Sequence, residues 1–196
     1  MKAILLTIRL KYFYLTYKGI KTIEIRKSAP KDFVGDVYEV VSKTNFEKDL
    51  LEIPENEREF FRQFKGKVGL KFTLNKVEEI KCSAMFNVPT YNTETLFERQ
   101  LCIKSCLGIY DIGDYLWHKK GYAWHISNLE IFDEPKELRE FEKVGSYNNH
   151  TIKCKKKEQG RCNFGKSKFT GKWVGCEKAR LTKAPHSYMF IEVGKI

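Results

Sequence analysis

The chain has 196 residues, which is long enough for one domain with a sizeable core. Hydrophobic residues make up 42% of the sequence and charged residues 31%, a balance that excludes a disordered tail or a collagen-like polymer. No apolar stretch approaches the ~18 residues of a membrane helix, and Arg9 and Lys11 interrupt the N-terminal apolar run before a secretory signal could form. We therefore expect a cytoplasmic protein with no membrane partner.

The apolar pattern predicts strands interspersed with short helices. In chain order it predicts a strand (3–9), a helix ending at Gly19 (10–18), two strands (21–28 and 36–42), a helical stretch broken by Pro54 (45–64), a long strand (66–80), a helix (92–106), a short helix capped by Asp111, a strand (121–132), a short helix opened by Pro135 and ending near Phe141, and a closing strand (186–193). About six strands without regular βαβ repetition favour an α+β fold. In it, a small sheet curves into a partial barrel with short helices on its flanks.

The positive charge is concentrated at the C-terminal end. Residues 1–142 hold 23 Lys/Arg and 22 Asp/Glu, a net charge of +1, whereas residues 143–196 hold 13 and 3, a net charge of +10. This distribution predicts a polyanionic partner, most simply nucleic acid, although a solvated surface would carry the same charge. Residues 143–180 show little periodicity, so we expect a basic insertion before the closing strand of a single domain spanning residues 1–196.

Residues 19–26 (GIKTIEIR) place two cations and a carboxylate where a helix gives way to a strand. By the period of two in a strand, Thr22, Glu24 and Arg26 share one face, with Lys21 at its mouth. A guanidinium fork and a carboxylate together suit the recognition of a planar polar group. The alternative is a solvated strand face with one Glu–Arg pair.

Three segments resemble one known family. They are residues 4–26, with the core Gly-x-Lys-Thr-x-Glu-x-Arg, residues 121–129 (GYAWHISNL) followed by 135–138 (PKEL), and residues 181–188 (LTKAPHSY). In this order they resemble the ASCH domain of the PUA-like superfamily, as found in bacterial and phage proteins. The resemblance implies a small pseudo-barrel whose cleft recognises RNA or a modified base. Some small bacterial members deacetylate N4-acetylcytidine with a Lys and a Thr of this motif and a Glu elsewhere. Here Lys21 fills the Lys position, and Glu24 occupies the Thr position.

We therefore expect a nucleic-acid-binding module for RNA or a modified base, with ligand contacts from Lys21, Thr22, Glu24, Arg26 and Tyr122. The alternative is a hydrolase that processes a nucleoside or RNA, either N4-acetylcytidine amidohydrolase-like or a ribonuclease, with Lys21 transferring a proton. A third alternative, an interaction protein for an acidic protein partner, leaves the cleft unused. Because the polar strand face is expected to be exposed, Glu24→Gln is expected to leave the fold intact.

Aromatic residues of the 121–132 strand supply a candidate stacking platform. Tyr122 and Trp124 share one face of that strand. We expect Trp124 in the core and Tyr122 partly exposed, where it could stack on an unpaired base. His125 and His186 are expected to be hydrogen-bonding side chains rather than catalytic ones.

The basic end carries two further predictions. Phosphate contacts are expected from Lys153, Lys155, Lys156 and Lys157. A structural zinc ion is predicted from four soft ligands in a lysine-rich segment with little apolar content, namely His150, Cys154, Cys162 and Cys176. The alternative is three unrelated thiols in a flexible loop, and no other cofactor is expected.

Overall fold

The computed structural model describes residues 1–82, 89–90, 95–117, 119–143, 165–166, 173–174 and 180–193. Its elements are β1 (Lys2–Ile8), α1 (Leu10–Tyr17), β2 (Ile23–Arg26), β3 (Gly35–Val41), α2 (Phe46–Leu51), α3 (Glu55–Arg62), β4 (Val68–Cys82), β5 (Pro89–Thr90), α4 (Thr95–Ser105), α5 (Ile109–Leu116), β6 (Gly121–Lys136), a 3-10 helix (Leu138–Glu140), β7 (Glu142–Lys143), β8 (Gly165–Lys166), β9 (Trp173–Val174) and β10 (Tyr188–Glu192). The predicted α+β class is confirmed. None of the helices in these ranges has the length and apolar composition needed to cross a membrane.

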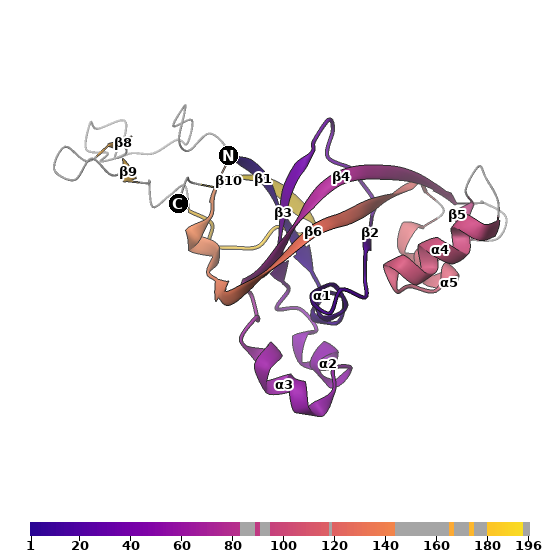
Figure 1. Ribbon diagram of the computed structural model, residues 1–196, viewed down its shortest axis with the longest axis horizontal. Coiled ribbons are helices and arrows are strands. Elements are labelled where there is room, and N and C mark those ends of the chain that lie inside the picture. Colours follow the sequence, from indigo (N-terminus) through magenta and orange to yellow (C-terminus); the bar gives the residue numbers. More distant parts are fainter. Residues whose placement is uncertain are drawn as a thin grey trace.

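One mixed sheet organises the fold (Figure 1). Its strand order is β2-β6-β4-β3-β1-β10-β7, and β5 pairs with the end of β4. β1 pairs in parallel with β3 and antiparallel with β10, where Leu6 lies opposite Tyr188. The six predicted strands correspond to β1, β2, β3, β4, β6 and β10. The seventh strand of the sheet, β7, has two residues, too few for its alternation to show in the sequence.

The curvature of the sheet comes from the long pair β4–β6 (Figure 1). Their register shifts at three places, between Val68 and Leu70, between Lys71 and Thr73, and between Leu74 and Val77. Each irregularity places one or more extra residues on one of the two strands, which bends the strand and increases its twist. The pair therefore curves around the apolar core instead of forming a flat ribbon.

The sheet is buried on both of its faces at β1. Leu6 of β1 belongs to the largest core cluster, together with Phe13 of α1 and Phe61 of α3. Leu5 points to the opposite face and joins a second cluster with Ile191 of β10. The continuous apolar run of residues 3–6 is typical of a strand covered on both faces.

A third core cluster attaches α4 and α5 to the edge of the sheet. Ile23 and Ile25 of β2 pack there with Leu101 of α4 and with Ile112 and Leu116 of α5. All four residues of β2 are buried. The other two residues of the strand therefore face the interior, where the candidate site lies.

The prediction that Pro135 opens a helix is wrong. Pro135 lies inside β6, which continues to Lys136, and only a 3-10 helix follows. Proline fits because β2 pairs only with residues 122–125 of β6. The later part of β6 therefore has a free edge within the described residues, and the missing N–H removes no ladder hydrogen bond.

The prediction that Asp111 caps the start of a helix is also corrected. α5 begins at Ile109, with Gly108 as the N-cap residue, so Asp111 lies within the first turn. Its carboxylate accepts a hydrogen bond from the Gly108 N–H at 3.1 Å. The carboxylate thus stabilises the helix start from inside the helix, because free N–H groups and the positive end of the dipole are there.

Candidate functional site

A pocket of about 420 Å³ lies at the junction of the β1–α1 turn, β2 and α5. Lys21, Glu24 and Arg26 line it together with the side chains of Tyr12 and Tyr115. Leu107, Asp111, Ser42 and His186 are also among the lining residues. The structure therefore brings three of the five residues predicted to contact the ligand into one cavity.

The local sequence explains how these side chains reach the pocket. α1 ends before Gly19, which adopts a left-handed conformation (φ +70°) that favours glycine at this position. The chain then reverses into β2, where alternation sends Ile23 and Ile25 into the cluster under α4 and α5. Glu24 and Arg26 consequently point to the other side of the strand, into the pocket.

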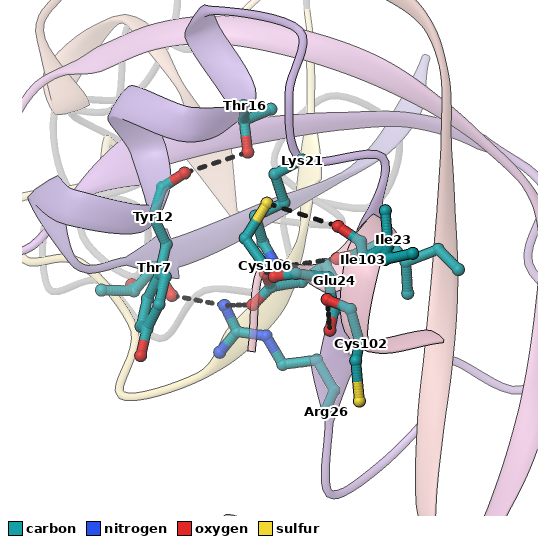
Figure 2. A network of polar contacts seen from close by, with 11 residues as sticks. Thr7, Tyr12, Thr16, Lys21, Ile23, Glu24, Arg26, Cys102, Ile103 and Cys106 are labelled. Carbon is teal, nitrogen blue, oxygen red and sulfur yellow. Dashed lines mark hydrogen bonds and ion pairs between the residues drawn. The ribbon is translucent and has the colours of Figure 1, made fainter. Parts of the chain in front are cut away.

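Lys21 connects β2 to the end of α4 (Figure 2). Its ammonium nitrogen Nζ donates to the Ile23 carbonyl at 2.6 Å and to the Ser105 carbonyl at 2.9 Å. A third contact, at 3.2 Å, joins Nζ to Oε2 of Glu24. An ammonium group has three donors, so all of them have partners in the structure. Lys21 is thus a fixed positive charge rather than a freely moving one.

Glu24 bridges the two cations of the site (Figure 2). Its Oε1 lies 2.8 Å from Nη2 of Arg26, which also donates to the Thr7 carbonyl at 2.7 Å. Glu24 is 6% exposed and Arg26 7% exposed. The expectation of an exposed polar face is therefore wrong, because strand pairing and α5 cover it. Nε of Arg26 is buried and has no partner among the described residues.

Glu39 is a further acidic residue near the site that the sequence analysis did not identify. It lies on β3 and is completely buried, and neither carboxylate oxygen has a partner in the described part of the chain. Burial raises the pKa of Glu39 well above its ordinary value of 4.5; the Glu24 carboxylate raises it further, while Lys21 and Arg26 lower it. Lys21, Glu24 and Arg26 by themselves carry a formal net charge of +1. In the sequence, a single glutamate inside the otherwise uncharged run VYEVV is the pattern that could have identified Glu39 as a buried carboxyl.

Two tyrosine rings flank the polar network. Nζ of Lys21 lies 5.7 Å from the centre of the Tyr12 ring, and Nζ of Lys27 lies 4.9 Å from that of Tyr115. Burial raises the pKa of both phenols. The sequence analysis missed both residues, because α1 and α5 are distant in the chain and meet only in the fold.

The structure places the two other predicted ligand residues outside this pocket. Thr22 is exposed and precedes β2, so the alternation of side chains along the strand does not place it on the face of Glu24 and Arg26. The Thr22 N–H donates to the Lys104 carbonyl, while its carbonyl accepts from the Ile126 N–H of β6. Tyr122 lies opposite Arg26 in the β2–β6 ladder but packs against the main core and does not line the pocket. Trp124 is completely buried, as predicted.

The two histidines lie in different surroundings. His125 contacts the Glu78 carboxylate through Nε2 on the β4–β6 pair, in agreement with a hydrogen-bonding role. His186 is exposed and lines the pocket. Arg9, also at the pocket, forms a two-point ion pair with Asp49, whose side chain is completely buried.

The predictions for the basic end lie outside the described residues. These are the phosphate contacts of Lys153, Lys155, Lys156 and Lys157, and the zinc ligands His150, Cys154, Cys162 and Cys176. In the described ranges no group of three or more His, Cys, Asp or Glu residues could hold a metal ion. Both predictions about the basic end therefore stay predictions.

No protein-family model and no curated protein matches the sequence. Among solved structures, ASCH from Zymomonas mobilis is similar at 11% sequence identity and a TM-score of 0.45, over 69% of this chain and 73% of that one. A tyrosine-to-phenylalanine mutant of the Zymomonas mobilis ASCH protein is similar at 14% identity and a TM-score of 0.45, over 70% and 77% of the two chains. These values assign no ligand and no activity to this chain. The chain is thus similar to ASCH proteins, the family that its three sequence segments resemble.

Proposed function

We propose that this protein is a nucleic-acid-binding module that receives one unstacked base, of RNA or of a modified nucleotide, in the pocket around Lys21, Glu24 and Arg26. The observation that carries the proposal is the buried ion network between two tyrosine rings. A pocket volume of about 420 Å³ also lies within the usual ~300–1,000 Å³ of small-molecule sites.

The chemistry of the pocket suits the edge and the faces of a nucleobase. The carboxylate of Glu24 accepts hydrogen bonds from amino or imino groups, and the guanidinium of Arg26 donates to a ring nitrogen or carbonyl. Tyr12 and Tyr115 offer rings on which a flat base can stack. A net positive network also favours an electron-rich or anionic edge over a cationic ligand.

The charge distribution supports a polymer that carries phosphates. Residues 143–196 have a net charge of +10, while residues 1–142 are close to neutral. In this proposal Lys153, Lys155, Lys156 and Lys157 supply contacts to the backbone, and the pocket supplies recognition of a base. The resemblance of three sequence segments to the ASCH domain, for which RNA or modified-base recognition is expected, agrees with this division of labour.

The test is a binding titration with single-stranded RNA oligonucleotides that differ in one base, which is unmodified, methylated or acetylated. Tyr115→Ala removes a pocket ring that is 39% exposed, so the fold should tolerate the change. We expect it to weaken binding by about 1–3 kcal/mol, the contribution of one stacked base. The matched control is Tyr110→Ala, because Tyr110 lies on the same helix, is 71% exposed and does not line the pocket. Equal affinities for the two variants would contradict the proposal.

The hydrolase alternative is favoured by one observation, the pair Glu39 and Glu24. A buried carboxyl whose pKa is raised, close to an ion-paired carboxylate, is an arrangement that supplies a proton donor and an acceptor. Lys21 is less suited to proton transfer than the sequence suggested, since its three donors already have partners. Mass spectrometry of acetylated and methylated nucleosides and of RNA after incubation with the protein distinguishes the two functions. Turnover establishes the enzyme, and unchanged substrate supports the binding module.

A further inference from the structure

A second pocket, of about 280 Å³, adjoins the first. The two pockets share Tyr12, Leu107 and Asp111 as lining residues. On its far side the second pocket is lined by Lys11, Tyr14 and Cys106, among others. The two cavities therefore form one continuous groove between α1 and the α4–α5 turn.

Tyr12 divides this groove into two compartments. Nζ of Lys21, which lines the first pocket, is 5.7 Å from the centre of the Tyr12 ring. Nζ of Lys11, which lines the second pocket, is 5.2 Å from the same centre. In Figure 2 the Tyr12 side chain lies beside Thr7 and the guanidinium of Arg26, at the first compartment. Each compartment thus pairs the ring with a cation of its own.

The start of the helix that carries Tyr12 supplies a cation to each pocket, although the carboxylates of Asp111 (both pockets) and Glu52 (the second) also line them. α1 contains no acidic residue, and Arg9 and Lys11 stand on either side of Leu10 at its start, one lining each pocket. Besides the Tyr12 ring, Lys11 has a 3.3 Å contact with Glu52, whose side chain is 46% exposed. Such a partly exposed pair contributes little to stability, so a phosphate can replace Glu52 as the partner of Lys11.

We propose that the two pockets are neighbouring subsites for consecutive nucleotides of a single strand, and this proposal rests on the proposed function. One base enters the first pocket, the next enters the second beside Tyr14, and the phosphate between them passes Lys11. The Tyr12 ring lies between the two bases, which therefore cannot stack on each other. A base-paired duplex does not meet this condition, so the partner is single-stranded. A free nucleoside would leave the second subsite empty.

Cys106 provides a reporter for the second subsite. It lines the second pocket but not the first, and Figure 2 shows it near Lys21 at the end of α4. Burial raises the pKa of its thiol, so alkylation with iodoacetamide is best followed in mildly alkaline buffer. Cys102, on α4 and outside both pocket linings, is the internal control in the same peptide-level mass spectrometry.

The experiment compares three probes on the full chain: a mixture of ribonucleoside monophosphates, a mixture of ribodinucleotides, and tetraglutamate. We expect saturating dinucleotides to slow alkylation of Cys106 but not of Cys102, and monophosphates to slow neither. Dinucleotides should also bind at least about fivefold more tightly than monophosphates, the smallest effect of one added stacked base.

A variant of Lys11 tests the phosphate contact. Lys11→Met keeps the aliphatic length and should reduce the slope of the salt dependence of dinucleotide binding by about one. Lys18→Met is the matched control, because Lys18 pairs with Glu57 and lines neither pocket.

The outcomes separate the two proposals. If monophosphates bind, but dinucleotides bind no more tightly and leave Cys106 unprotected, the second subsite is wrong and the proposed function stands. If neither kind of nucleotide binds, the proposed function fails and the subsite with it. If tetraglutamate alone protects Cys106, the groove binds an acidic peptide and both proposals are overturned.

Discussion

Both faces of β2 are buried, but apolar side chains line one face and charged side chains line the other. On one face Ile23 and Ile25 pack under α4 and α5, and on the other Glu24 and Arg26 form an ion network in the pocket. Apolar contacts are non-directional, so an apolar face tolerates a similar side chain at little cost. A buried ion network depends on each partner, because removing one leaves the others without compensation. We therefore expect substitutions on the two faces to lower the free energy of unfolding by very different amounts.

The largest effect is expected from Glu24→Ala. The substitution leaves Lys21 and Arg26 buried without their shared carboxylate, which should lower the free energy of unfolding by about 3–5 kcal/mol. Urea denaturation followed by circular dichroism measures this loss. Glu59→Ala is the control, because the Glu59 side chain is 93% exposed, and its loss should cost less than about 0.5 kcal/mol. A similar small effect at Glu24 would show that the network does not stabilise the fold.

Glu39 should give the network a dependence on pH. Its pKa is raised in the folded protein, so the folded state holds this proton more tightly than the unfolded state does. Stability from Glu39 is then fully present below its ordinary pKa of 4.5 and is lost as the pH rises toward the folded value. The loss should approach about 1.4 kcal/mol per pH unit within that window.

The Glu39→Gln variant isolates this contribution, because glutamine is similar in size and does not titrate. Urea titrations of parent and variant between about pH 5 and pH 8 should show a steeper decline of stability in the parent. The difference between their slopes is the diagnostic quantity, since other groups titrate equally in both proteins. Parallel slopes would mean that the Glu39 carboxyl carries no raised pKa.

The smallest effect is expected on the apolar face of the same strand. Ile25→Val removes one methylene group from a residue that is 4% exposed, and it should lower the free energy of unfolding by about 0.5–1.5 kcal/mol. Ligand affinity should not change, because valine keeps the β-branched shape and the direction of β2. An affinity loss matching that of Tyr115→Ala would show that the two faces are not independent.

The sequence predicted the strands that alternate or run continuously apolar, and it identified Lys21, Glu24 and Arg26 as neighbours. The predictions from the sequence failed where the neighbouring strand or helix determines the local structure. Pro135 continues a strand because one edge of β6 is free there, and Thr22 lies just outside β2, where its N–H donates to the Lys104 carbonyl of α4. Neither fact is encoded in the local pattern of residues.

The burial of the site could not be derived from the sequence either. Glu24 alternates with two isoleucines, which is the pattern of a half-exposed strand, but the pocket face is covered by segments distant in the chain. Tyr12 and Tyr115 come from helices that no short motif connects. Glu39 gave a signal, a charge in an apolar run, although its closeness to Glu24 depends on the strand order β2-β6-β4-β3 and on the curvature of the sheet.

The position of β1 in the sheet has a consequence for synthesis on the ribosome. β1 can pair with β3 soon after both emerge, but its other neighbour is β10, since Leu6 lies opposite Tyr188. At ~5–20 residues per second, roughly ten to forty seconds separate the translation of these two strands. During that interval a largely apolar strand has one unpaired edge, the kind of surface to which other chains add. Newly made chains should therefore depend on chaperone protection until β10 has been translated.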